Sequence, residues 1–338
     1  MDCLNQDRYC RQILFAPIGR EGQERLRNGR AVILGCGALG AAQASLLARA
    51  GVGKLRIVDR DYVEESNLQR QTLFDESDAR EKLPKAAAAQ RKLRLINSDV
   101  EVEGVIADAR GDNIEEIISG ANVVLDGCDN FETRFLLNDA AVKLRIPWIY
   151  GAVVGSYGMT LTILPGQTAC FACALPEPPE GLGETCDTAG VIGPAVNWVA
   201  SIQVTEALKI LLGLEAELHG KLMDYDIWSN RLQQVRVARD PSCRVCAKHE
   251  FLRLNGAFPA PIVLCGRDAV QIRQARQLDL GALESRLGAF GEVRANAYLV
   301  HCRLKDYELT VFPDGRALIK GTHDPAIARS LYARYIGA

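Results

Sequence analysis

Four cysteines occur as two C-x-x-C pairs, a spacing that suits either metal binding or a redox dithiol. The first pair is Cys170 and Cys173, and the second is Cys243 and Cys246. Four thiolates complete the tetrahedral coordination of one Zn²⁺ and leave no position open for catalysis. A redox dithiol, which needs only one pair at the start of a helix, remains an alternative, as do unliganded cysteines. The two pairs therefore predict a structural zinc site that joins two distant segments of the chain.

A glycine-rich stretch with the spacing G-x-G-x-x-G follows a short apolar run. Its glycines are Gly35, Gly37 and Gly40, and Asp59 ends the next apolar run. Glycines let backbone N–H groups approach a phosphate beside a helix N-terminus, and a carboxylate after the second strand can accept hydrogen bonds from ribose. A glycine turn that serves only packing is the alternative. The pattern favours a nucleotide site in a strand–helix–strand unit.

The segment after Asp59 carries more cationic and polar side chains than a dinucleotide needs. They are Asn67, Arg70 and Lys85, and such donors suit a triphosphate and its developing charge. All four histidines lie outside the nucleotide half, so a hydride-transfer histidine has no obvious candidate there. For Arg70 and Lys85 the alternative is a solvated charged surface. For the whole chain the rival enzyme class is an NAD(P)-binding Rossmann oxidoreductase.

Two aspartates, Asp126 and Asp129, lie around the end of a strand predicted within residues 121–130. Ligands of open α/β sheets bind at the carboxyl ends of the strands. A carboxylate there can hold Mg²⁺ against phosphate oxygens. An aspartate that caps the helix starting near Asn130 is the alternative. The two roles need not exclude one another, and the spacing alone leaves a magnesium site and a helix cap both open.

The apolar pattern supplies the elements that must position these residues. Apolar runs alternate with helical patterns from about residue 31 to 165, including a helix from about Glu132 to Leu144. This alternation predicts a doubly wound, Rossmann-like, mostly parallel α/β sheet. A further helix is predicted over 194–212, with Pro194 at its start and Gly213 just past its end. Polar residues interrupt this helix, so it is expected to be buried or at an interface rather than in a membrane.

Composition shifts divide the chain into a large and a small part. We predict a nucleotide-binding domain over 1–250 and a small α/β domain over 260–338. In the small domain, a hairpin turns at Asp314 and Gly315, and Pro325 opens a closing helix. The proline- and glycine-rich segment 176–190 has no basic residue and predicts a mobile loop.

The overall composition favours a cytoplasmic globular protein. The chain has 338 residues, 48% hydrophobic and 24% charged, with a formal net charge of -2. That near-neutral charge gives no electrostatic case for nucleic acid or an anionic membrane as partner. The first residues, MDCLNQDRYCRQ, do not resemble a signal peptide, and eleven cysteines then suggest a reducing compartment. Buried thiols are predicted for the cysteines in apolar or strand-end contexts, Cys36, Cys128, Cys265 and Cys302.

Taken together, these motifs resemble the ThiF/MoeB/HesA adenylyltransferases, which are relatives of the ubiquitin-activating enzymes. The resemblance spans about residues 5 to 248. It rests on both cysteine pairs and on the stretches RYCRQI, GCGALG, VDRDYVEESNLQRQTLF, PKA, DGCDN and ETCDTAGVIGP. The tail after about residue 250 resembles C-terminal extensions of some ThiF-type chains.

The resemblance implies ATP-dependent adenylation of the C-terminal Gly-Gly carboxylate of a ubiquitin-like or sulfur-carrier protein, with release of pyrophosphate. Such chemistry requires positioning and charge neutralisation more than a protein nucleophile. The implied roles are ribose binding by Asp59, phosphate contacts by Asn67, Arg70 and Lys85, and Mg²⁺ binding by Asp129.

The resemblance also implies roles for Arg11 and Cys186. Arg11 would reach the γ-phosphate from the neighbouring subunit of a homodimer. Cys186 matches the family's catalytic cysteine, which forms a thioester or an acyl-disulfide during sulfur transfer. Glu184 and Asp187 should raise the pKa of that thiol, so an unreactive loop cysteine is the alternative.

Several functional questions stay open at this point. A non-catalytic ATP-binding scaffold is the rival outside enzymes, although the cationic residues it would be expected to lose are present. Within the family, thiamine sulfur transfer, molybdopterin sulfur transfer and protein conjugation all begin with the same adenylate. A sulfurtransferase is a further candidate partner.

Overall fold

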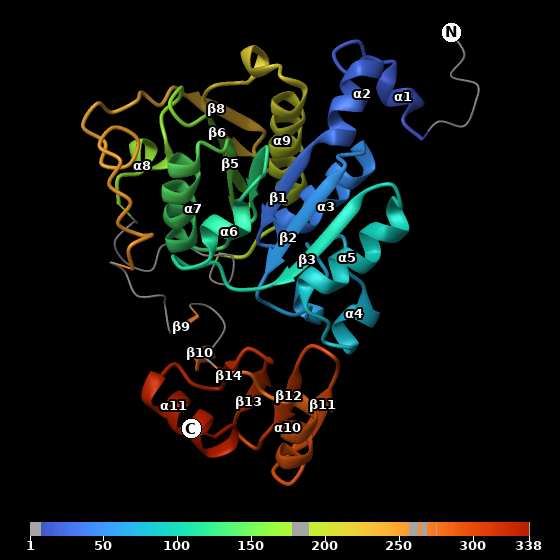
Figure 1. Ribbon diagram of the computed structural model, residues 1–338, viewed down its shortest axis with the longest axis vertical. Coiled ribbons are helices and arrows are strands. Elements are labelled where there is room, and N and C mark those ends of the chain that lie inside the picture. The colour runs from blue at the N-terminus through green and yellow to red at the C-terminus, as the bar shows by residue number, and fades with distance from the viewer. Residues whose placement is uncertain (1–7, 178–188, 257–262, 265–268, 275, 338) are drawn as a thin grey trace. The chain divides into compact units, whose positions relative to one another are not determined.

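A computed structural model describes residues 8–177, 189–256, 263–264, 269–274 and 276–337 (Figure 1). The chain divides into two compact units, Met1–Phe258 and Pro259–Ala338. Each unit has its own sheet and its own core. Cys186 and Cys265 lie outside the described residues, as does most of the loop predicted over 176–190.

The first unit is built on an eight-stranded sheet with the order β3-β2-β1-β4-β5-β6-β7-β8. The five strands β3, β2, β1, β4 and β5 pair in parallel with their neighbours. From β5 onward, β6, β7 and β8 are added as antiparallel strands. The predicted doubly wound, mostly parallel sheet is therefore confirmed. The strands are β1 (Arg30–Leu34), β2 (Lys54–Asp59), β3 (Glu101–Ile106), β4 (Val123–Asp126), β5 (Trp148–Val154), β6 (Tyr157–Ile163), β7 (Leu222–Asp226) and β8 (Arg231–Val235).

Helices cover both faces of this sheet. They are α1 (Cys10–Ile13), α2 (Gly19–Asn28), α3 (Ala38–Ala50), α4 (Glu76–Arg80), α5 (Lys85–Ile96), α6 (Ile114–Ile118), α7 (Phe131–Leu144), α8 (Phe171–Ala174) and α9 (Gly193–Leu212), with short 3₁₀ helices η1 (Glu65–Asn67) and η2 (Glu215–Glu217). Ile33 of β1 packs in the core formed with α3, α5 and α9, whereas its neighbour Val32 packs in the core formed with α6 and α7. Because successive strand side chains point to opposite faces, a strand buried on both faces is continuously apolar. This explains the unbroken apolar run that predicted β1.

Helix α9 is the most apolar long helix that the structure describes. It meets the length and hydropathy criterion for a membrane span, but 50% of its most apolar window is buried within the protein. It packs against α3, β5 and β6. Its exposed side carries Asn197, Ser201 and Thr205, which hydrogen-bond to the preceding turn of the helix. This criterion is weak evidence for a membrane span, because core helices of globular proteins also meet it. The contacts of α9 with α3, β5 and β6 agree with the buried helix predicted over 194–212.

The second unit contains a six-stranded antiparallel sheet with the order β11-β12-β13-β14-β10-β9. The predicted hairpin is confirmed by β13 and β14, and Gly315 in its turn has a φ of +79°. The closing helix is confirmed as α11, where the Asp324 side chain accepts a hydrogen bond from the Ala326 N–H. The elements are β9 (Val263–Leu264), β10 (Ala269–Arg273), α10 (Leu280–Leu287), β11 (Glu292–Ala295), β12 (Val300–Arg303), β13 (Glu308–Val311), β14 (Arg316–Lys320) and α11 (Pro325–Tyr335).

Candidate active site and metal centre

The glycine turn lies between β1 and α3. Gly35 has a φ of +89°, and a Cβ there would lie 2.5 Å from the carbonyl oxygen of Gly127. A Cβ on Gly40 would overlap the carbonyl of Gly35. Gly37 differs, because the nearest atom to its hypothetical Cβ is 3.9 Å away. Two glycines therefore serve the packing of the turn, and the third leaves open space before the N-terminus of α3, where backbone N–H groups can receive an anion.

Asp59 ties the glycine turn to the end of β2. One carboxylate oxygen accepts from the Cys36 N–H and the other from the Asp61 N–H, each at 2.6 Å. Burial raises the pKa of Asp59 above its ordinary value, although the charge of Lys85 acts in the opposite direction. Each oxygen retains a lone pair beyond its backbone hydrogen bond. The carboxylate can therefore hold the turn and accept a ribose hydroxyl at once.

Lys85 begins α5 and is buried beside Asp61. Its side chain is 3% exposed, and its Nζ lies 3.6 Å from Asp61 Oδ2. The Lys85 N–H also donates to the carbonyl oxygen of Asp61 at 2.8 Å. A solvated charged surface is therefore the wrong interpretation of Lys85. A buried ammonium beside the open glycine turn is suited to phosphate binding.

Asn67 and Arg70 come from the segment that follows β2. Asn67 is buried at the end of η1, and its Oδ1 accepts from the Glu64 N–H at 3.2 Å. Arg70 is partly exposed, and its Nη1 donates to the Ser66 carbonyl at 2.8 Å. Asn67 therefore shapes its own loop, whereas Arg70 keeps a side chain that solvent reaches.

The two aspartates after β4 have different surroundings. Asp126 is fully buried, and its Oδ2 accepts from Arg134 Nε at 3.0 Å. Its Oδ1 accepts from the Cys128 N–H at 2.8 Å. Asp129 is exposed at the carboxyl edge of the sheet. Asp126 is therefore engaged inside the protein, and Asp129 is the one of the two that can reach a metal ion at this edge of the sheet.

Neither aspartate caps α7, so the alternative reading of them as helix caps is wrong. Asn130 is the N-cap, and its Oδ1 accepts from the Thr133 N–H at 2.8 Å. Asn130 also donates to Asp129 Oδ1 at 3.1 Å. An asparagine is as good a cap as an aspartate, so the start of α7 does not depend on Asp129 as its cap.

Arg11 is not brought to the glycine turn of its own chain. It is exposed on α1, which is anchored at the far end of α3, since Gln12 Nε2 donates to the Ala50 carbonyl at 2.8 Å and Tyr9 packs on Gly51. Helix α3 has 13 residues. At 1.5 Å per residue it separates α1 from the glycine turn by ~20 Å, more than one arginine side chain can span.

The four predicted metal ligands meet in one cluster. Their Sγ atoms all lie within 4.8 Å of one another. Three Sγ–Sγ distances are 3.9 Å for Cys170 and Cys173, 3.7 Å for Cys170 and Cys243, and 3.4 Å for Cys173 and Cys246. Tetrahedral zinc with Zn–S bonds of 2.3 Å requires Sγ–Sγ distances of ~3.8 Å. Donor type, number and spacing therefore fit one zinc ion, and a lone redox pair does not describe the cluster.

Two side chains outside the cluster support its cysteines. Asn138 of α7 is fully buried, its Nδ2 lies 3.7 Å from Cys170 Sγ, and its Oδ1 accepts from the Phe171 N–H at 2.9 Å. Arg239 donates to the Cys246 carbonyl at 3.0 Å. Burial raises the pKa of Cys173 to about 11. A bound divalent cation would counter this effect by stabilising the thiolate.

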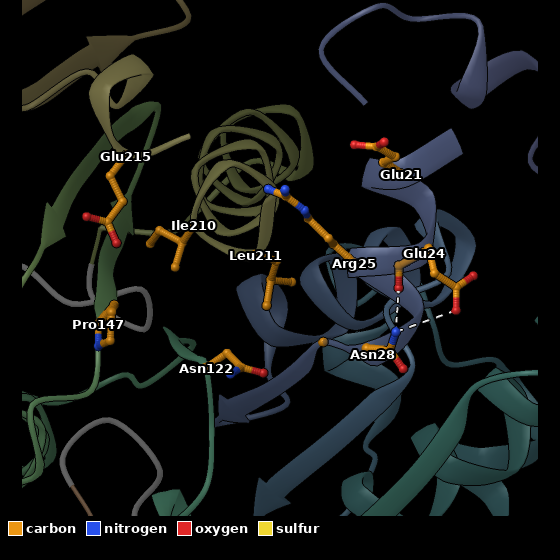
Figure 2. Close-up of a pocket in the computed structure, with 10 residues that line it drawn as sticks. Glu21, Glu24, Arg25, Asn28, Asn122, Pro147, Ile210, Leu211 and Glu215 are labelled. Atoms are coloured by element: carbon orange, nitrogen blue, oxygen red, sulfur yellow. Dashed lines mark hydrogen bonds between the residues drawn. The ribbon is translucent and has the colours of Figure 1, made fainter. Parts of the chain in front are cut away.

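A cavity of about 670 Å³ lies at the amino ends of β1, β4 and β5 (Figure 2). Its polar lining includes Glu21, Glu24 and Arg25, and Arg25 Nη1 donates to the Leu212 carbonyl at 2.6 Å. Among the described residues, none of those predicted for the nucleotide site lines it. Ligands of open α/β sheets bind at the carboxyl ends instead, so the candidate active site is not in this cavity.

The structure adds site residues that the sequence reasoning missed. Asp61 flanks Lys85, Arg134 neutralises Asp126, and Asn138 contacts a cysteine of the cluster. A signal existed for Asp61, because it stands two residues after Asp59 in the same motif. Arg134 and Asn138 lie in an ordinary helical pattern, and only the packing of α7 identifies them.

Comparisons with known proteins agree with this arrangement. Residues 9–245 match the family described as ThiF family. The sulfur carrier protein ThiS adenylyltransferase of Bacillus subtilis is 52% identical over 336 residues, which cover 98% of this chain and 99% of that protein. The SAMP-activating enzyme E1 of Haloferax volcanii is 41% identical over 249 residues, which cover 73% of this chain and 91% of that protein.

A solved structure has the same fold at lower identity. Escherichia coli MccB with ATP matches with a TM-score of 0.63 and 24% identity, over 72% of this chain and 75% of that one. At this identity the likeness concerns the fold alone. The family match and the two relatives carry the assignment, and the chain belongs to the ThiF family.

Proposed function

We propose that this chain is an ATP-dependent adenylyltransferase that activates the C-terminal carboxylate of a sulfur-carrier protein. The main support is the 52% identity to a sulfur carrier protein ThiS adenylyltransferase over 98% of the chain. The open glycine turn beside buried Lys85 adds independent support. All of the residues proposed for this reaction lie in the first unit.

The reaction joins a carboxylate to the α-phosphorus of ATP. A carrier carboxylate oxygen forms a bond to that phosphorus, and the bond between the α-phosphorus and the bridging oxygen breaks. The electron pair leaves with pyrophosphate, so no protein nucleophile is needed in this step. The chain contributes positioning and positive charge. Asp59 binds the ribose, and Asn67, Arg70 and Lys85 contact the phosphates.

Asp129 is the residue that would hold Mg²⁺. Its support is exposure at the carboxyl edge, in contrast with buried Asp126. A magnesium ion supplies charge neutralisation at phosphate oxygens when it is bound. The four clustered cysteines would hold a structural zinc ion that is closed to catalysis.

The chain acts as a homodimer in which Arg11 serves the neighbouring subunit's nucleotide. The support is the anchoring of α1 at the far end of α3 from the glycine turn. Mixing Arg11→Ala chains with Arg70→Ala chains tests this arrangement, since each heterodimer then contains one site with both arginines. Half of the randomly formed dimers are heterodimers with one intact site of two, so activity should return to about a quarter of wild type. Activity that stays near zero after subunit exchange would place Arg11 in its own chain's site, and full activity of Arg11→Ala chains alone would place Arg11 outside catalysis.

ATP–pyrophosphate exchange with purified Gly-Gly-ended carrier proteins tests the activity itself. Exchange should depend on the carrier and should fall at least a hundredfold (about 2.7 kcal/mol) in Arg70→Ala. Nucleotide binding without exchange for any carrier would favour the non-catalytic scaffold. Binding of NAD without exchange would favour the oxidoreductase.

Cys186 forms a covalent bond to the activated carrier in a later step. The proposal rests on its sequence context, because Cys186 lies outside the described residues. Attack of its thiolate on the acyl-adenylate would form a thioester and release AMP. Intact mass spectrometry of the enzyme after reaction tests the role. If the Cys186→Ala enzyme formed the covalent adduct in unchanged yield, Cys186 would not be the residue that bonds to the carrier.

A further inference from the structure

An ion pair between Arg60 and Asp108 bridges the ends of β2 and β3 beside Asp59. Arg60 directly follows Asp59, and Asp108 lies just beyond the end of β3. Arg60 Nη1 donates to Asp108 Oδ1 at 3.0 Å, and the two side chains are 19% and 11% exposed. The pair is therefore sheltered, although it lies at the edge of the sheet where ligands of this fold bind.

The surroundings of Arg60 are unusually acidic. Burial lowers the pKa of its guanidinium, but the carboxylates of Asp61, Asp108 and Asp129 outweigh burial and raise the pKa above its ordinary value. Asp61 follows β2 and Asp129 follows β4. The guanidinium is thus within electrostatic reach of carboxylates that follow three strand ends, which places it at the carboxyl edge of the parallel sheet.

A second arginine, on the strand that Arg60 follows, shows what a purely structural ion pair looks like. Arg56 pairs with Glu103 across β2 and β3, with an Nε–Oε2 distance of 2.8 Å. Its Nη1 also donates to the carbonyls of Glu116 and Ile117, so several donors are used within the protein. Within the described residues, the guanidinium of Arg60 makes only the hydrogen bond to Asp108. Its other N–H groups make no hydrogen bond among these residues, and its side chain keeps 19% exposure through which a ligand can reach it.

The direction of the nucleotide follows from the residues already placed. Phosphates belong at the glycine turn after β1, and Asp59 at the end of β2 receives the ribose. The sheet continues from β2 to β3. The base must therefore extend toward the ends of β2 and β3, where Arg60 and Asp108 lie.

We propose that Arg60 is a nucleotide-binding residue whose guanidinium, held by Asp108, packs its planar face against the base. A guanidinium fixed along one edge by a carboxylate presents a flat cationic surface, and such surfaces stack on aromatic rings. This inference rests on the proposed function for the orientation of the nucleotide. The inference goes beyond the proposed function because it assigns a residue that contacts the adenine base, which none of the residues proposed for the phosphates or the ribose does.

Equilibrium binding of ATP and AMP to the full-length chain tests the proposal without any carrier protein. Arg60→Met should raise the Kd of both nucleotides about tenfold, because both contain the adenine base and both lose the cation that stacks on it. Arg56→Met is the matched control, since it breaks another β2–β3 ion pair, which lies within the strands and away from their carboxyl ends. It should change neither Kd by more than about twofold. Asp108→Asn should have a smaller effect than Arg60→Met, because the arginine remains but is less firmly held.

Arg60→Lys separates stacking from simple charge. A lysine keeps the positive charge but lacks the plane, so this variant should bind AMP nearly as weakly as Arg60→Met. Wild-type affinity in Arg60→Lys, or a loss confined to ATP in Arg60→Met, would overturn the base-side assignment in favour of a phosphate contact. Equal effects of Arg60→Met and Arg56→Met on nucleotide affinity would show that the Arg60–Asp108 ion pair is only structural, and would also overturn the proposed contact with the base.

Protein stability and catalysis are read separately in these variants. Melting temperatures identify a variant that fails to fold, in which case Arg60→Lys and Asp108→Asn carry the test. Loss of AMP affinity in Arg60→Met together with no pyrophosphate exchange in wild type would retain the nucleotide contact while rejecting the adenylyltransferase. Failure of the proposed function and failure of this inference therefore give different results.

Discussion

The four-cysteine cluster and the carboxyl edge of the parallel sheet are both contacted by α7, yet they differ in how complete they are within one chain. At the cluster, four ligands of one type converge within 4.8 Å, and Asn138 of α7 supports one of them. At the edge, Asn130 caps the same helix beside exposed Asp129, while Arg70 is partly exposed and Arg11 lies at the other end of α3.

This difference separates a site that holds the fold from one that must receive and release ligands. A closed tetrahedral shell stabilises the folded state and needs no further group. A site for ATP and a carrier protein must leave positive charges and N–H groups unsatisfied until those ligands bind. Substitutions at the cluster should therefore reduce stability, and substitutions of the exposed edge residues should reduce activity.

The largest effect is expected from removing one cysteine of the cluster. Cys243→Ala should abolish metal retention and lower the free energy of unfolding by more than about 4 kcal/mol, because metal binding contributes directly to folding. Metal content by mass spectrometry and denaturant unfolding measure the two effects. Cys302→Ala is the control, since Cys302 is a buried thiol of the second unit outside the cluster, and it should cost only ~1 kcal/mol. Equal losses in both variants would contradict the distinction between the two regions.

The next effect concerns Asp139, which follows Asn138 on α7 and accepts from the Arg253 N–H at 3.0 Å. Burial raises the pKa of this carboxyl to about 6. The folded protein then binds more protons than the unfolded chain between about pH 4 and pH 6, so the free energy of unfolding falls as pH rises through this range. Asp139→Asn keeps an acceptor but carries no charge. It should be more stable than wild type at about pH 7.5, by up to about 3 kcal/mol, and similar at about pH 4.

Denaturant unfolding at a series of pH values measures this difference. An unchanged pH dependence in Asp139→Asn would show that another group is responsible. Pyrophosphate exchange should be nearly unaffected at neutral pH, because Asp139 lies on the side of α7 that holds the segment after the second cysteine pair.

Arg70→Ala should have the opposite profile. Loss of this partly exposed cation, which we propose contacts the phosphates, should reduce pyrophosphate exchange about a hundredfold (about 2.7 kcal/mol) while changing the free energy of unfolding by less than ~0.5 kcal/mol. Arg94→Ala is the control on an exposed helix end. A large loss of stability in Arg70→Ala would mean that this residue of the carboxyl edge stabilises the fold, as the cysteines of the cluster are expected to do.

The smallest effect is expected at Asn138, which contacts the cluster without being a ligand. Asn138→Leu removes the donor to Cys170 Sγ and the acceptor for the Phe171 N–H. Metal affinity should fall about tenfold or more, since residues that orient ligands typically have this effect. Competition with a chromogenic chelator measures it. Unchanged affinity would show that the cysteines alone define the site.

Much of the fold could be predicted because its signals are local. The apolar run of β1 and the caps of α9 and α11 each depend on a few consecutive residues. The antiparallel part of the first sheet could not be predicted as well. All five residues of β8 are exposed, so this edge strand has no alternation of apolar and polar residues.

The sequence by itself determined the ligand types and their local spacing: two cysteine pairs, a glycine turn with its acid, and the cations that follow. These depend on residue identity and on short-range geometry. Only the tertiary structure decided which groups meet. It brought the two cysteine pairs into one cluster, buried Asp126 against Arg134 while leaving Asp129 exposed, and placed Arg60 on Asp108. The physical reason is that charge and coordination act over a few ångströms in space, and packing of distant segments sets those distances.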